Sequence, residues 1–285
     1  MNILFIAKHR WPHVGGVEVH MRELGEELKK KNYEITTISE ENIKYPHIKI
    51  IGLLYIWFWF LKKLKLILWA DMIHIHDVFI WFLPFRFLFF WKKVYITFHG
   101  WEGKFPIPPW FIFNKRLANY LSNGSIAVGR YIEKWYGITA TYITYGGVDL
   151  RSRIKDLRKT NNTLIWLGRL EKDTGLLEFL SWSSRLDHGY KIVFVGDGSL
   201  RKECEKYGKV VGNVKNPEKY LITSEYCVPS GYLSYLEAKN YGCKIITFAN
   251  NQLKKDYWEE ISKLRKIPIW KEVADVYISL YNSKR

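Results

Sequence analysis

The chain has 285 residues, of which 48% are hydrophobic and 25% are charged. This length allows one large domain or two small ones, with ample apolar material for buried cores. Lys and Arg number 44 against 28 Asp and Glu, so the net charge is +16, which indicates an anionic partner, a membrane surface or a general lysine bias. The three cysteines lack metal-ligand spacing and are odd in number, which favours buried thiols in a reducing compartment.

The N-terminal residues predict a strand followed by a helix. Ile3–Ala7 is a short apolar run typical of a buried strand. These five residues are too few for the core of a signal peptide, so we expect a cytoplasmic protein. The apolar residues that follow recur on one face of a helix, at Val17, Met21, Leu24 and Leu28.

Strands and helices alternate along the rest of the chain, which predicts parallel sheets built from βαβ units. In the first half we expect further strands at Ile35–Ser39, Ile48–Ile51, Met72–Ile75, Val94–Phe98 and Gly124–Val128. In the second half we expect them at Thr163–Leu167, Lys191–Val195, Tyr226–Val228 and Lys244–Phe248. A polar linker with five basic residues, Arg151–Asn162, separates the two halves. We therefore predict two Rossmann-like α/β domains facing a cleft, at residues 1–150 and 151–268, and a C-terminal helix within residues 269–285.

One segment of the first half is unusually aromatic and basic. Between Tyr55 and Phe113 lie 21 of the 48 aromatic residues, and residues 44–116 contain eleven Lys or Arg but only three acids. The apolar run Leu53–Leu61 is too short to cross a membrane, because a spanning helix needs about 20 mostly apolar residues. It is followed by Lys62, Lys63 and Lys65, a pattern typical of a helix in a membrane interface.

Phe79–Trp91 has a similar character, although Pro84 is expected to kink or interrupt a helix there. Two other interpretations of the aromatic segment stay open. It could be a buried or dimer-forming surface, or a platform for nucleic acid, but nucleic-acid platforms interleave aromatic and basic residues along a groove. We therefore expect an anionic membrane surface as a partner and no nucleic acid.

Several residues follow the predicted strands of the first half and could carry chemistry. Gly15 and Gly16 precede a helix, where glycines let backbone N–H groups approach an anion. His74 and His76 share one face of a strand, but no third ligand is evident nearby, so we expect no metal. We expect His74 to be a core histidine and His76 to line the ligand crevice; His99 ends the run Thr97-Phe-His99 after another strand.

The second half carries the most informative motif. The strand that ends at Leu167 runs into Gly168 and Arg169, which places a guanidinium at its carboxyl end, where open α/β sheets bind ligands. Arginine and a helix N-terminus there suit a diphosphate. The turn at Gly196 follows the next strand, and Leu236-Glu237-Ala238 follows further along the chain.

Together these motifs resemble the retaining nucleotide-sugar glycosyltransferases of family 4, which have the GT-B fold. The resemblance implies two Rossmann-like domains, the second one shortened here, and a C-terminal helix that crosses back onto the first. It implies that His99 lies against the transferred sugar, that Gly15 and Gly16 approach the donor phosphates, and that Gly196 lies beneath the nucleotide. No metal or other cofactor is expected.

The resemblance also assigns roles in the second domain. Arg169 and a lysine would neutralise the leaving diphosphate, but Thr174 stands at the lysine position, and Lys172 is the nearest basic alternative. Glu237 would bind the ribose. The family's first glutamate, eight residues earlier, is absent, because Pro229 stands there. Backbone N–H groups near Leu233 and Ser234 could still meet phosphates.

The function expected from this resemblance is transfer of a hexose from a nucleotide diphosphate sugar, with retention at the anomeric carbon. The acceptor would be lipid-linked or a glycan, presented at the inner membrane surface to a peripheral enzyme. The alternative is a degenerate, non-catalytic member that binds a nucleotide or a membrane, as the changes at positions 174 and 229 suggest. A dinucleotide oxidoreductase fits less well, because the loop before Gly15 is too long for its glycine fingerprint.

Overall fold

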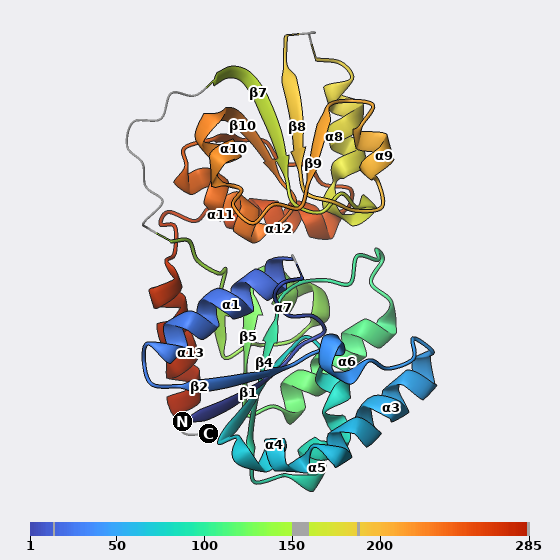
Figure 1. The fold of residues 1–285 in the computed structure, drawn as a ribbon, viewed down its shortest axis with the longest axis vertical. Coiled ribbons are helices and arrows are strands. Elements are labelled where there is room, and N and C mark those ends of the chain that lie inside the picture. The colour runs from blue at the N-terminus through green and yellow to red at the C-terminus, as the bar shows by residue number, and fades with distance from the viewer. Residues whose placement is uncertain (14, 150–159, 187–188, 284–285) are drawn as a thin grey trace. The chain divides into compact units, whose positions relative to one another are not determined.

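The computed structural model describes residues 1–13, 15–149, 160–186 and 189–283. These residues form two compact units, each a parallel sheet covered by helices (Figure 1). The first unit comprises Met1–Glu102, Pro106–Thr144 and the C-terminal residues from Lys271, and the second comprises Gly103–Phe105 and Tyr145–Trp270. The predicted polar linker lies largely outside the described residues.

The first unit alternates strands and helices as the sequence predicts. Its sheet has the order β2-β1-β3-β4-β5-β6, and all its pairs are parallel. Its strands are β1 (Asn2–Ile6), β2 (Glu34–Ile38), β3 (Met72–His76), β4 (Lys93–Phe98), β5 (Gly124–Val128) and β6 (Tyr142–Thr144). Its helices are α1 (Gly16–Lys29), α2 (Glu40–Ile43), α3 (Lys49–Lys62), α4 (Leu64–Trp69), η1 (Phe79–Trp81), α5 (Leu83–Leu88), α6 (Pro109–Leu121), α7 (Arg130–Tyr136) and α13 (Trp270–Asn282).

The strand predicted at Ile48–Ile51 is wrong, because α3 already begins at Lys49. Three isoleucines and a lysine fit a strand as well as a helix, and here they lead into an apolar run long enough for a helix. Pro84 lies in the first turn of α5, where proline is tolerated, so it helps to start this helix instead of kinking one.

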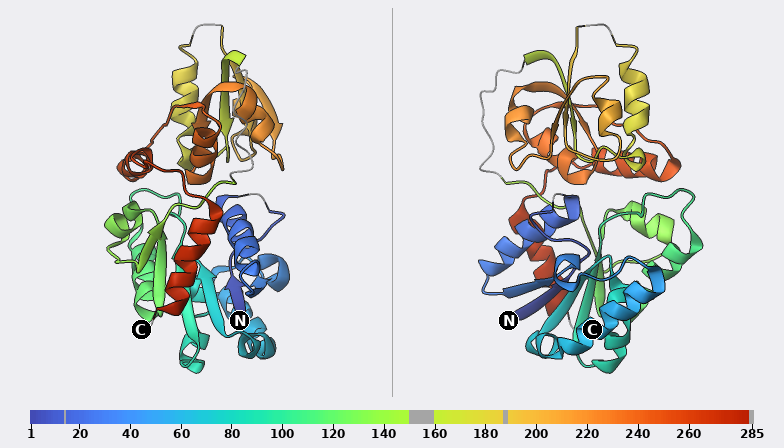
Figure 2. Two further views of the ribbon diagram at one scale, coloured as in Figure 1. Left: turned by 90° about the vertical axis from the view of Figure 1, so that its left-hand side faces the viewer. Right: turned by 45° about the vertical axis from the view of Figure 1, so that its right-hand side comes forward.

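Helix α13 belongs to the first unit although it ends the chain (Figure 2). Its Tyr277 hydroxyl lies 3.0 Å from Oγ1 of Thr97 on β4, and its Tyr281 hydroxyl lies 2.8 Å from Nδ1 of His74 on β3. Lys31, just after α1, forms an ion pair of 2.8 Å with Asp275. The last helix is therefore tied to strands much earlier in the chain: Tyr277 is separated from Thr97 by 180 residues and Tyr281 from His74 by 207.

The second unit has a five-stranded parallel sheet of order β11-β10-β7-β8-β9. Its strands are β7 (Thr160–Leu167), β8 (Lys191–Val195), β9 (Lys209–Gly212), β10 (Ser224–Pro229) and β11 (Lys244–Ile245). Its helices are η3 (Lys172–Thr174), α8 (Leu176–Ser183), α9 (Arg201–Cys204), α10 (Glu218–Thr223), α11 (Tyr232–Asn240) and α12 (Gln252–Ser262).

Strand β7 is the centre of this unit and is buried on both faces. Leu164 and Trp166 pack into the core on one face, and Ile165 and Leu167 into the core on the other, as the two-residue period of a strand requires. The strand starts three residues earlier than predicted, because Thr160 pairs with Ser224 of β10 inside the polar stretch. In the other direction, β11 is shorter than the predicted Lys244–Phe248. All three cysteines are buried.

Candidate functional site

In the first unit, the candidate residues gather at the carboxyl ends of β1, β3 and β4. Strand β2 lies on one side of β1 and β3 on the other, so the chain changes direction between β1 and β3. Such a switch point opens a crevice at the strand ends, where α/β sheets bind ligands. Residues Gly15, His76 and His99 follow these three strands or end them.

His76 and His99 form a buried imidazole pair. His76 Nδ1 lies 2.8 Å from His99 Nε2, and the two side chains are almost fully buried. Burial lowers the pKa of both rings well below the ordinary value, so both are neutral and one shared N–H joins them. Among the described residues, the far atoms of the pair, His76 Nε2 and His99 Nδ1, have no hydrogen-bond partner. They can therefore donate to or accept from a ligand.

His74 is a core histidine, as the sequence indicates. Its Nε2 lies 2.8 Å from Thr97 Oγ1 and its Nδ1 lies 2.8 Å from the Tyr281 hydroxyl, so both ring nitrogens have partners. His20 of α1 is also fully buried, and its Nε2 lies 3.0 Å from the Tyr277 hydroxyl. Burial lowers the pKa of His20 and of His74 to about 3. These hydrogen bonds hold the rings of His20 and His74, which lie beside His99 and His76.

An acidic and basic network, which the sequence analysis did not single out, supports His99. The backbone N–H of His99 donates to the carboxylate of Asp77, at 3.1 Å to Oδ1. Lys115 of α6 is 6% exposed and its Nζ lies 3.3 Å from Asp77 and 3.2 Å from Glu102. Burial raises the pKa of Asp77, and Lys115 opposes that shift. Nothing in the local sequence indicates that Lys115 is buried, because lysines on helices are usually exposed.

The glycine pair begins α1. Gly15 is the residue before the helix and Gly16 is its first residue, with open space where a Cβ would lie. A Cβ on Gly15 would come within 2.3 Å of Oε2 of Glu18, so the helix's own carboxylate lies beside its N-terminus. A phosphate that approaches this N-terminus therefore meets a neighbouring negative charge.

The second unit has an equivalent switch point between β7 and β10. Strands β8 and β9 lie on one side of β7, whereas β10 and β11 lie on the other. The Ser230 N–H, just after β10, donates to the Leu167 carbonyl at 2.9 Å. Gly168 has φ of +124°, and a Cβ there would lie 1.8 Å from Ser230 Oγ. Gly196 has φ of +150° and packs against the Gly168 carbonyl, so both turns require glycine.

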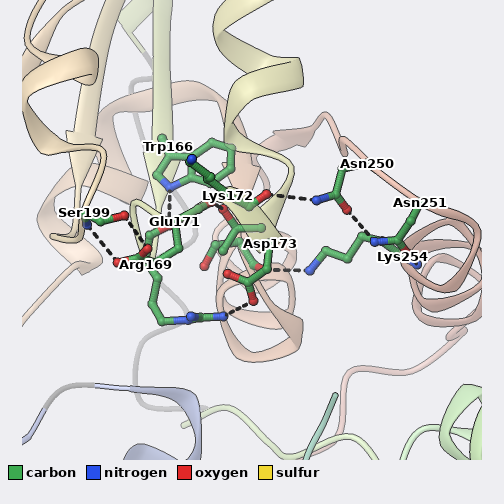
Figure 3. A network of polar contacts seen from close by, with 11 residues as sticks. Trp166, Arg169, Glu171, Lys172, Asp173, Ser199, Asn250, Asn251 and Lys254 are labelled. Atoms are coloured by element: carbon green, nitrogen blue, oxygen red, sulfur yellow. Dashed lines mark hydrogen bonds and ion pairs between the residues drawn. The ribbon is translucent and has the colours of Figure 1, made fainter. Parts of the chain in front are cut away.

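Arg169 lies at this switch point with a largely exposed guanidinium (Figure 3). It donates to Asp173 Oδ2 at 2.7 Å, and its carbonyl accepts from the Trp166 indole at 3.3 Å. Lys172, predicted as a possible inward-reaching cation, is exposed, and its carbonyl accepts from Asn250 at 2.9 Å. Thr174 is buried, and its hydroxyl donates to the Glu171 carbonyl at 2.6 Å, so this position is closed to a ligand.

Helix α11 places the remaining candidates. Leu233 and Ser234 are its second and third residues. Their N–H groups belong to the first turn, where the helix itself offers no carbonyl to accept their hydrogen bonds. Ser234 Oγ donates to the Gly231 carbonyl at 2.9 Å and receives the Gly231 N–H at 3.1 Å. Glu237 lies one turn further along and is partly exposed.

Neither unit offers a metal site within the described residues: no group of three His, Cys, Asp or Glu there could hold an ion. The arrangement instead provides neutral imidazoles in the first unit and a cation, glycine turns and a helix N-terminus in the second. The latter set suits a phosphorylated ligand.

Comparison with known proteins agrees with this arrangement. Residues 14–152 match the sequence model of the family described as Glycosyltransferase Family 4, whereas no curated protein sequence matches the chain. The structure is similar to that of Anabaena Alr3699/HepE in complex with UDP, with a TM-score of 0.64, 13% identity, and coverage of 99% of this chain and 90% of that one.

Two further solved structures are also similar. The glycosyltransferase AviGT4, involved in avilamycin A biosynthesis, has a TM-score of 0.58 and 11% identity, with 99% of this chain and 98% of that chain covered. The UDP-GlcNAc 2-epimerase from Methanocaldococcus jannaschii has a TM-score of 0.57 and 12% identity, with 99% and 100% covered.

The two parallel-sheet units, with these neighbours, define the GT-B fold, as predicted. The match over residues 14–152 and the GT-B fold confirm the resemblance to the family 4 glycosyltransferases that the motifs indicate.

Proposed function

We propose that the protein transfers a hexose from a UDP-sugar to an acceptor, with retention of the anomeric configuration. The observation that carries this proposal is the pair Gly168-Arg169 at the switch point of the second unit. Gly168 has no side chain to cover its backbone, and the guanidinium of Arg169 is largely exposed. Similar folds bind such donors: Anabaena Alr3699/HepE has been solved with UDP-glucose, and an α-glucosyltransferase with UDP-glucose and DNA.

In the proposed reaction, the bond from the anomeric carbon to the diphosphate breaks, and UDP leaves as an anion. Arg169 stabilises the charge that develops on it. The acceptor hydroxyl attacks on the same face and loses its proton to the departing diphosphate, so the configuration is retained. The neutral His99, held by His76, contacts a hydroxyl of the sugar and positions it.

A second candidate is a non-catalytic protein that binds a nucleotide sugar. The closed position at Thr174 and the proline at position 229, where an acid is expected from the resemblance, favour it. Both candidates require the nucleotide site of the second unit, so they differ in turnover and not in binding.

A turnover assay separates them. The protein is incubated with UDP-glucose and with UDP-GlcNAc, with and without lipid-linked acceptors, and UDP release and the anomeric proton of the product are followed by NMR. We expect acceptor-dependent UDP release and a retained anomer, with about a 10²-fold loss of rate in Arg169→Ala. The exposed Arg185→Ala serves as the control. Nucleotide binding without turnover would support the second candidate, and conversion of the donor to an epimer would contradict both.

We further propose that the acceptor is presented at an anionic membrane, to which helix α3 binds. Its exposed residues form an apolar stripe within about 140° of the helix circumference, given 100° per residue: Ile50, Ile51, Leu54, Tyr55, Phe58 and Leu61. The opposite face packs inward, with Ile56 and Phe60 buried. Large exposed apolar patches of this kind mark interaction surfaces.

Basic and aromatic neighbours extend this stripe. Lys62 Nζ lies 4.4 Å from the Phe58 ring centre, and Lys63 Nζ lies 5.9 Å from that of Trp59. On α5 and after it, Phe87, Phe90 and Trp91 are exposed as well. In Figures 1 and 2, α3, α4 and α5 lie along one edge of the first unit. No helix within the described residues is long and apolar enough to cross a bilayer, and the aromatic residues beside lysines favour a position in its interface.

Vesicle binding tests the stripe. The double variant Leu54→Ser/Phe58→Ser should lose most of its binding to vesicles that contain phosphatidylglycerol, measured by co-sedimentation. Leu177→Ser removes an exposed leucine of the second unit and should leave binding unchanged. Equal binding by the wild-type protein and the double variant would contradict the membrane proposal.

A further inference from the structure

Lys254 is a buried cation at the switch point of the second unit. It is the third residue of α12 and is 5% exposed. Its Nζ donates to the Ser230 carbonyl at 3.0 Å and lies 4.5 and 4.6 Å from the ring centres of Tyr257 and Trp258. Within the described part of the chain it forms no ion pair with a carboxylate, although an ammonium has three donors to satisfy.

The Ser230 carbonyl places this ammonium at the carboxyl ends of β7 and β10. Ser230 is held by its N–H, which donates to Leu167, the last residue of β7. Gly168 follows directly and packs so closely on Ser230 that a side chain is excluded. Lys254 therefore reaches the ends of the two strands between which an open α/β sheet binds its ligand.

Arg169 and Asp173 are the charged groups that face Lys254. Both act on the lysine electrostatically, Asp173 favouring its charged form and Arg169 opposing it. Because Asp173 is already paired with Arg169 at 2.7 Å, two cations share one carboxylate. The local excess of positive charge is suited to a ligand with more than one negative charge.

The surrounding contacts hold α12 in this position. Asn251 caps the helix by accepting the Lys254 N–H at 2.9 Å, and the neighbouring Asn250 donates to the Lys172 carbonyl at 2.9 Å (Figure 3). The Trp258 indole donates to the Phe248 carbonyl at 2.7 Å. The position of Lys254 is therefore set by a helix that is itself held by hydrogen bonds.

We propose that Lys254 and Arg169 together bind the diphosphate of the nucleotide, with Lys254 as the buried cation of the site. This inference rests on the proposed function, because it concerns the same nucleotide site. The diphosphate would take the ammonium donors that the protein leaves unused and would supply the missing counter-charge.

The protonation of this lysine gives the site a pH dependence. Burial lowers the pKa of Lys254 to about 7, with Arg169 adding to the shift and Asp173 opposing it. The Tyr257 hydroxyl, whose ring lies beside the ammonium, stays neutral because burial raises its pKa. An anionic ligand favours the charged lysine, so diphosphate affinity should fall as the pH rises above 7.

Calorimetric titration tests the inference with UDP, uridine and inorganic pyrophosphate. Lys254→Met keeps most of the apolar part of the side chain and removes the ammonium, with its charge and its hydrogen bond to the Ser230 carbonyl. We expect this variant to bind UDP and pyrophosphate at least tenfold more weakly and uridine unchanged. Lys255, the exposed neighbour of Lys254, provides the control. Lys255→Met should bind UDP, uridine and pyrophosphate as the wild-type protein does. Between pH 7 and 9, UDP affinity should fall in the wild-type protein and stay flat in Lys254→Met.

The outcomes separate this inference from the proposed function. Unchanged UDP affinity in Lys254→Met, or the same pH profile in both proteins, would overturn the role of Lys254 while leaving the nucleotide site in place. If the wild-type protein binds no UDP, the proposed function fails, and the pyrophosphate titration then decides on Lys254 alone. If Lys254→Met does not fold, as judged by circular dichroism, Lys254→Gln replaces it in the same comparison.

Discussion

Lys115 is the buried cation of the first unit and holds two carboxylates beside His99. Its ammonium lies within 3.3 Å of both Asp77 and Glu102 and 4.9 Å from the Tyr136 ring centre. Tyr136 in turn donates its hydroxyl to Glu102. Loss of this one ammonium would leave two partly buried carboxylates facing each other without a counter-ion.

We therefore expect Lys115→Met to lower the free energy of unfolding by about 1–3 kcal/mol, less than for a fully buried pair because Asp77 and Glu102 are partly exposed. Urea unfolding measures this change. Adding Asp77→Asn should recover part of the loss, because it removes one of the unpaired charges. A double variant less stable than Lys115→Met would show that the Asp77 carboxylate is held mainly by the His99 N–H.

The buried histidines predict loss of stability in acid. His20 and His74 have pKa values lowered to about 3 by burial, whereas an unfolded histidine titrates near 6.5. Between these values the unfolded chain binds protons that the folded chain does not. Stability should therefore fall as the pH is lowered from about 6.5 towards 3, by about 1.4 kcal/mol per pH unit for each histidine.

Urea unfolding at pH 7, 6 and 5 measures this slope. His20→Leu removes one of the titrating groups, so its slope should be smaller than that of the wild-type protein by about one proton. Parallel slopes for His20→Leu and the wild-type protein would mean that His20 is already charged in the folded state.

At the scale of elements, α13 closes the first unit through two tyrosines. The hydroxyl of Tyr277 joins Thr97 and His20, each at 3.0 Å, in a fully buried position. Tyr277→Phe should destabilise the protein by about 1–3 kcal/mol, because it removes the buried hydroxyl that hydrogen-bonds both partners. Tyr120→Phe changes a tyrosine that is 85% exposed and should have no measurable effect. Equal thermal stability of the two variants would contradict the role given to α13.

The lysines at the junction of α3 and α4 should provide the charge-dependent part of membrane binding. Lys62, Lys63 and Lys65 are exposed and line a surface pocket with Leu61 and Trp69. Replacing all three by Ser should weaken binding to anionic vesicles by about 1 kcal/mol per charge. Replacing Lys202, Lys209 and Lys215 on the second unit changes the net charge equally and should have little effect. Equal losses in both triple variants would indicate that only net charge matters.

The sequence predicts these elements well where their periodicity is long. Apolar strands such as Val94–Phe98 and the helix that carries Met21, Leu24 and Leu28 lie where they are expected. Ile48–Ile51 is different, because a stretch of four residues with three isoleucines does not distinguish a strand from the start of a helix. The structure shows that these residues lead into α3, which packs on the first unit with the ring centres of Phe60 and Phe85 5.5 Å apart.

The candidate site is predictable only in part, for a related reason. Glycine turns and histidines after strands are visible in the sequence, and so is Arg169. Lys254 belongs to the pair Lys254-Lys255, which is typical of a solvated helix face, and only the rings of Tyr257 and Trp258 show that one of the two is buried. The contact of Lys115 with Asp77 joins residues 38 positions apart, beyond any local pattern.

At the scale of the whole molecule, the two units carry one polar centre each, and the first unit also carries an apolar surface. The second unit carries the cations at the ends of β7 and β10, and the first carries neutral imidazoles at the ends of β3 and β4. The exposed apolar side chains gather in the first unit, mainly between residues 48 and 120. This separation suits a protein that takes a soluble nucleotide sugar and an acceptor from a membrane.

Thermal unfolding with added ligand tests whether the second unit binds the nucleotide of a sugar donor. The protein is heated with UDP, GDP and ADP and with their common sugar conjugates. A ligand at 100 times its dissociation constant should stabilise the fold by about 2.7 kcal/mol, which raises the melting temperature by several degrees. We predict this rise with UDP and UDP-sugars. No rise with any of the nucleotides would contradict the account.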